Sequence, residues 1–95
     1  MSKKKILIVD DEKDICELLG FQLQRDGFQV EAAYNGKQAL ETLKQVRVDL
    51  IISDVRMPGG DGLYLLDGLR KSGNETPLIF LSGFADIDLD EFRAQ

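Results

Sequence analysis

The sequence contains no histidine and a single cysteine, Cys16. Without histidine, the commonest transition-metal ligand and general base is missing, so any metal site must use oxygen ligands. One cysteine cannot form an internal disulfide, which fits a reducing compartment. No apolar run approaches the length of a membrane span, and the N-terminus lacks a signal-peptide pattern. We therefore expect a cytoplasmic protein with no membrane partner.

Positive charge is also scarce. The 12 basic and 17 acidic side chains give a net charge of -5, which argues against direct nucleic-acid binding by this chain. The 95 residues are 43% hydrophobic and 31% charged, as in ordinary globular proteins. The length suits one domain over residues 1–95, with a modest core.

Apolar runs alternate with segments of helical period along the whole chain. Strands are predicted at residues 6–9, 28–32, 49–53 and 77–82, with helices between them and the start of a further helix over 86–95. Strands that alternate with helices indicate a parallel sheet with right-handed crossovers. The sequence therefore predicts an α/β fold.

Polar residues and glycine predict where these helices begin and end. Asn35 and Asp61 precede helical periods and are expected to be N-caps, and Gly27 is expected to end the first helix. Leu18 is expected on the apolar face of that helix. Cys16 is expected to be a small core residue.

Acidic residues follow two of the predicted strands. Asp10 and Asp11 come after the first strand, and Asp54 comes after the third. Ligands of open parallel sheets bind beyond the carboxyl ends of the strands, so neighbouring strands would bring these carboxylates together. At roughly 4 Å each pair would repel by about 4 kcal/mol, which a bound Mg²⁺ would relieve. Asp10 and Asp11 also have a structural alternative, as capping acids of the first helix.

These acids belong to a longer pattern that resembles a known family. Asp10-Asp11 after a first strand, Asp54-Val55-Arg56-Met57-Pro58-Gly59-Gly60-Asp61-Gly62 after a third, and Ser82 after a fourth are similar to the receiver domain of bacterial two-component response regulators. The resemblance runs from Lys5 to about Arg93. It implies a flavodoxin-like, doubly wound parallel sheet with strand order 2-1-3-4.

The resemblance also implies roles for individual residues. Asp54 would accept the phosphoryl group and would also be a metal ligand. Asp11 would bind Mg²⁺ directly, Asp10 would bind it mainly through water, and the backbone carbonyl of Arg56 would be a further ligand. Ser82 would hydrogen-bond the phosphoryl group and reorient when it arrives.

The implied function is that of a phosphoacceptor module in two-component signal transduction. The donor would be a sensor histidine kinase or a phosphotransfer protein. Such a domain promotes only its own phosphorylation and dephosphorylation, so we do not expect a turnover enzyme.

The chain departs from the family pattern at its C-terminal end. It stops at Gln95, before the family's fifth strand and fifth helix, and so lacks the lysine that pairs with the phosphoryl group. We expect the fourth strand, over 78–81, to be an edge with unpaired backbone groups. A homodimer or element-swapped oligomer through this edge is therefore expected.

Other functions fit less well. A degenerate receiver that binds partners without phosphorylation is the main alternative, and the missing lysine favours it. Haloacid-dehalogenase-like phosphohydrolases also place an aspartate after the first strand, but the run from Asp10 to Lys13 matches their pattern poorly. A dinucleotide-binding domain fits worse, because no glycine-rich loop follows the first strand.

Overall fold

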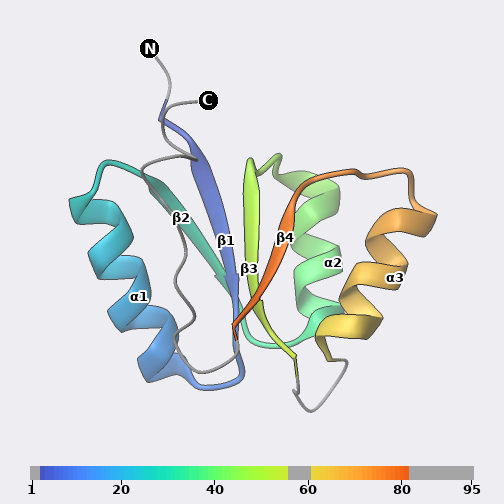
Figure 1. Cartoon of the computed structure of the whole chain (residues 1–95), viewed down its shortest axis with the longest axis horizontal. Helices are drawn as coiled ribbons and strands as arrows, with labels where there is room; N and C mark the ends of the chain where they lie inside the picture. The colour runs from blue at the N-terminus through green and yellow to red at the C-terminus, as the bar shows by residue number, and fades with distance from the viewer. Residues whose placement is uncertain (1–2, 56–60, 82–95) are drawn as a thin grey trace.

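Four strands and three helices alternate along the chain (Figure 1). The structure, a computed structural model, describes residues 3–55 and 61–81. In chain order the elements are β1 (Lys5–Val9), α1 (Lys13–Arg25), β2 (Gln29–Ala33), α2 (Gly36–Gln45), β3 (Leu50–Asp54), α3 (Gly62–Lys71) and β4 (Leu78–Leu81).

The strands form one parallel sheet in the order β2-β1-β3-β4. Ile8 of β1 lies between Ala32 of β2 and Ile52 of β3, which fixes the register at the centre of the sheet. The predicted α/β fold and strand order 2-1-3-4 are confirmed. All four strands end at the same edge, so whatever follows them gathers there.

Helices cover both faces of the sheet. In Figure 1, α1 lies on one side of the strands, and α2 and α3 lie together on the other. β1 is buried from Ile6 to Val9 because alternate side chains enter the two opposite cores. Burying each of these side chains contributes about 1.5–3 kcal/mol. A strand held this firmly is a rigid base for the residues that follow it.

Glycines end α1 and α3. Gly27 has φ 96° and Gly73 has φ 83°, a backbone region that residues other than glycine rarely adopt. After α1, the Phe28 N–H donates to the Leu23 carbonyl at 3.1 Å and the Gly27 N–H to the Gln24 carbonyl at 3.0 Å. This pattern is the Schellman motif, so Gly27 ends the first helix as predicted.

The N-terminus of α2 is capped from both directions. The Asn35 side chain accepts from the Gln38 N–H at 2.7 Å, and the Gln38 side chain accepts from the Tyr34 N–H at 2.7 Å. The predicted Asn35 cap is confirmed.

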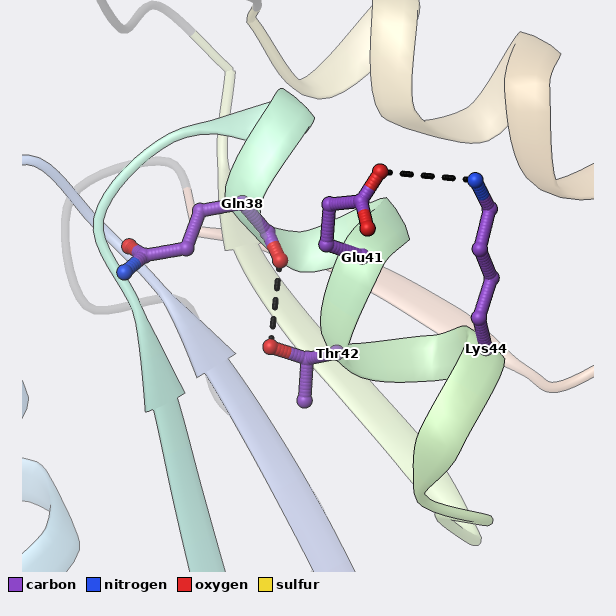
Figure 2. A network of polar contacts seen from close by, with 4 residues as sticks. All are labelled: Gln38, Glu41, Thr42 and Lys44. Carbon is purple, nitrogen blue, oxygen red and sulfur yellow. Dashed lines mark hydrogen bonds and ion pairs between the residues drawn. The ribbon is translucent and has the colours of Figure 1, made fainter.

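Figure 2 shows two polar contacts further along this helix. Thr42 donates to the Gln38 carbonyl at 3.0 Å, and Lys44 pairs with Glu41 at 3.4 Å.

The structure also corrects several predictions. Strand β2 begins at Gln29, one residue later than predicted, because Phe28 belongs to the Schellman turn. Strand β3 runs over Leu50–Asp54, so Asp54 is its last residue. Leu18 was expected on the apolar face of α1 but is 58% exposed, because the buried stripe of α1 is Cys16, Gly20 and Leu23.

Some expectations fall outside the described residues. They concern Arg56 as a metal ligand, Ser82 after the fourth strand, and the helix over 86–95. Within the ranges 3–55 and 61–81, no helix has both the length and the apolarity needed to cross a bilayer.

Candidate metal centre

Three carboxylates meet at the carboxyl edge of the sheet. Asp10 follows the last residue of β1, and Asp54 is the last residue of β3, whose Ser53 pairs with Val9 of β1. One carboxylate oxygen each from Asp10, Asp11 and Asp54 lies within 4.8 Å of the others. The adjacency of β1 and β3 is therefore what brings together acids that are more than forty positions apart in the sequence.

Asp10 is the buried member of the cluster, at 3% exposure. Its Oδ1 accepts from the Glu12 N–H at 2.9 Å, and its own N–H donates to the Ala33 carbonyl at 3.1 Å. Burial raises the pKa of Asp10; the Glu12 N–H opposes this, while the charges of Asp54 and Asp11 raise it further. Ionised Asp10 is thus held where its charge is poorly solvated.

Asp54 is half-buried at the mouth of β3. Its Oδ1 accepts from the Val55 N–H at 2.8 Å. Among the described residues nothing donates to Oδ2. The carboxylate is therefore oriented through one oxygen and has the other free for a ligand.

Asp11 is exposed and opens the cluster to solvent. A buried, a half-buried and an exposed carboxylate, all offering oxygen, match the ligand preference of a hard divalent cation such as Mg²⁺. The same three charges repel one another when no cation is bound. The donor set therefore fits the predicted magnesium site.

The helix-capping alternative does not account for Asp10 or Asp11. The N-cap of α1 is Glu12, which makes no side-chain capping hydrogen bond. Asp61, by contrast, caps α3 by accepting from the Tyr64 N–H at 2.9 Å, as predicted. The Arg56 carbonyl and Ser82, the other predicted site groups, lie outside the described residues.

Cys16 contacts the backbone of Asp10 but is not one of the residues of the acid cluster. Cys16 is 4% exposed, and its thiol donates to the Asp10 carbonyl at 3.5 Å. Burial, with the Asp10 charge, raises the pKa of Cys16 to about 11. The thiolate is the reactive form, so Cys16 is a core thiol rather than a nucleophile.

An open hollow lies at the opposite end of the sheet, where the strands begin. It has a volume of about 720 Å³ and is lined by residues 43–49 and 73–77. Its ionisable side chains are all exposed: Lys44, Arg47, Asp49 and Glu75. The hollow therefore offers less for a specific ligand than the three acids do.

One residue that supports the acid cluster from behind was missed from the sequence. Ser53 is fully buried, and its hydroxyl donates to the Asp54 carbonyl at 2.8 Å. The one available signal was its position, a polar residue between a buried apolar run and Asp54.

Comparison with known proteins agrees with the geometry. Residues 6–93 match the family model of the response regulator receiver domain. The receiver domain of a Francisella response regulator is 32% identical, with a TM-score of 0.80 over 97% of this chain and 76% of that one. The chemotaxis response regulator CheY4 of Vibrio cholerae is also 32% identical, with a TM-score of 0.81 over 95% of this chain and 77% of that one.

A third similar structure carries ligands. The response regulator TrrA of Thermotoga maritima, solved in complex with Mg²⁺-BeF, is 31% identical. It superposes with a TM-score of 0.74 over 94% of this chain and 95% of that one.

Proposed function

Since the chain belongs to the receiver domains of two-component response regulators, we propose that it accepts a phosphoryl group on Asp54 with the help of Mg²⁺. Such domains interact with histidine kinases or phosphotransfer proteins, and they are not generally turnover enzymes. The observation that carries the proposal is the convergence of Asp10, Asp11 and Asp54 within 4.8 Å. A cytoplasmic location and the metal role of the Arg56 carbonyl are part of the same proposal.

The transfer itself requires little from the protein beyond position and charge. A carboxylate oxygen of Asp54 attacks the phosphorus of a partner's phosphohistidine, the P–N bond breaks, and the electron pair stays on the imidazole nitrogen. Asp11 and Asp54, with Asp10 beside them, would hold Mg²⁺, which when bound would offset the charge of the carboxylates and of the phosphoryl oxygens. The Val55 N–H keeps the acceptor carboxylate oriented. Ser82 would hydrogen-bond the transferred group.

Asp54→Asn tests the proposal. The wild-type chain, incubated with Mg²⁺ and acetyl phosphate, should gain the mass of one phosphoryl group in a base-labile linkage that maps to Asp54. The variant should gain none, because an amide cannot form the acyl phosphate.

Asp67→Asn is the matched control, since Asp67 lies on α3 and pairs with Lys71 at 3.0 Å, outside the acid cluster. It should be phosphorylated like the wild type. No mass gain in folded wild-type protein would refute phosphotransfer and favour a module that binds partners unphosphorylated.

Self-association through β4 is a further part of the proposal. Within the described residues β4 has one neighbouring strand, β3, and all four of its side chains are half-buried. An apolar edge strand of this kind can pair with a second copy. Light scattering over a concentration series should show a mass that rises toward the dimer. A folded monomer at every concentration would exclude this association.

A further inference from the structure

The hydroxyl of Ser53 is one of two buried polar side chains recorded for the described residues, the other being Asp10. Ser53 is 0% exposed and follows the apolar run Leu50–Ile52 of β3. A buried hydroxyl is unfavourable unless it is hydrogen-bonded. The partner that Ser53 has is the carbonyl oxygen of Asp54, at 2.8 Å.

That carbonyl belongs to the same peptide group that orients the acceptor carboxylate. The peptide between Asp54 and Val55 receives the Ser53 hydroxyl on its C=O and donates its N–H to Asp54 Oδ1 at 2.8 Å. Because a peptide group is planar, fixing the C=O also fixes the direction of the N–H. A hydrogen bond accepted by the C=O also strengthens the N–H as a donor.

Gly62 contacts the peptide groups on both sides of Val55. Its N–H donates to the Val55 carbonyl at 2.8 Å, and a Cβ built on it would lie 2.6 Å from the Asp54 carbonyl oxygen. The first residue of α3 is thus packed against the oxygen that Ser53 binds. The peptide of Asp54 and Val55 is held between a buried hydroxyl and a helix start.

We propose that Ser53 is a positioning residue for the phosphoacceptor: its hydroxyl fixes the peptide whose N–H orients the Asp54 carboxylate. This inference depends on the proposed function, because it assumes that Asp54 is the acceptor. Without the hydroxyl the peptide can rotate and the carboxylate samples more orientations. The transfer step then slows, while acetyl phosphate, which cannot reach a fully buried Ser53, should bind as before.

Ser53→Ala is the test, measured as the rate of Asp54 phosphorylation across acetyl phosphate concentrations at saturating Mg²⁺. One lost hydrogen bond of ordinary strength predicts a maximal rate about fivefold lower. The donor concentration at half-maximal rate should change by less than about twofold. Ser72→Ala is the matched control, because the Ser72 hydroxyl also donates to a backbone carbonyl, that of Leu69 at 2.7 Å, but remote from the site.

The outcomes separate this inference from the proposed function. A wild type that is not phosphorylated would overturn both. A phosphorylated wild type with Ser53→Ala as fast as Ser72→Ala would overturn only the role of Ser53. If Ser53→Ala fails to fold, Ser53→Cys, which keeps a weaker donor of similar shape, should give a folded protein with at least a twofold lower maximal rate. An unchanged rate in Ser53→Cys would then refute the inference.

Discussion

Gly62→Ala should destabilise the folded chain by about 2–4 kcal/mol, measured by urea unfolding. A Cβ at this position would lie 2.6 Å from the Asp54 carbonyl oxygen and 2.6 Å from the Phe80 ring. One of these neighbours is backbone of a central strand, which cannot move aside without disturbing β3. Inside a helix, alanine is normally more favourable than glycine, so a large loss of stability here would run against helix propensity.

Gly68→Ala is the matched control on the same helix. Its Cβ would also meet a close neighbour, at 2.7 Å, but that neighbour is the end of the flexible Leu40 side chain. We expect Gly68→Ala to cost less than Gly62→Ala, because Leu40 can shift and the helix gains about 1 kcal/mol of propensity. A Phe80→Leu change should not rescue Gly62→Ala, since the Asp54 carbonyl remains. Equal losses in the two glycine variants would contradict this interpretation of the packing.

Asp10→Asn should have opposite effects on stability and on metal affinity. Without metal at neutral pH, it should stabilise the fold by about 1 kcal/mol, because it removes a buried charge that Asp54 and Asp11 repel. With Mg²⁺, it should weaken binding by about tenfold or more, because a charged ligand is lost. Urea unfolding and isothermal titration with Mg²⁺ measure the two effects.

The stabilisation by Asp10→Asn should depend on pH in one direction. Burial raises the pKa of Asp10 from its ordinary 3.8, so the folded state binds a proton more tightly than the unfolded state does. Wild-type stability therefore falls as the pH rises from 3.8 through the folded pKa, where Asp10 ionises. The advantage of Asp10→Asn should be full above that pKa and should shrink on acidification.

Asp67→Asn removes an exposed acid and is the control for both measurements. It should leave Mg²⁺ affinity unchanged and alter stability by less than about 0.5 kcal/mol. A destabilised metal-free Asp10→Asn, or one with wild-type Mg²⁺ affinity, would show that Asp10 acts as a structural hydrogen-bond acceptor rather than as a metal ligand.

Much of the fold followed from local patterns in the sequence. The apolar run Ile6–Val9 predicted a strand, and Asn35 and Asp61 predicted helix starts, because these signals depend on a few neighbouring residues. The prediction that Leu18 is buried was wrong, because hydrophobic spacing in α1 does not decide which of several apolar residues faces the sheet. That choice is made by packing, which here buries Cys16 and Gly20.

The acid cluster could be predicted from the sequence, but the contacts that hold the Asp54 backbone in place could not. Three acids after two strands become neighbours once β1 and β3 are adjacent, and the resemblance supplied that adjacency. The hydroxyl of Ser53 and the bare Cα of Gly62 act on a single carbonyl, that of Asp54. Such contacts depend on backbone positions to within a fraction of an ångström, which spacing along a sequence does not specify.

Anomalous diffraction from crystals grown with Mn²⁺ would test most directly whether the three carboxylates form one cation site. Mn²⁺ shares the oxygen preference of Mg²⁺ and scatters anomalously. We expect one strong peak at coordinating distance from carboxylate oxygens of Asp11 and Asp54, with Asp10 beside it, and loss of the peak in excess Mg²⁺. A map without a peak there, with Asp54 turned away from Asp10 and Asp11, would contradict the site and the phosphotransfer built on it.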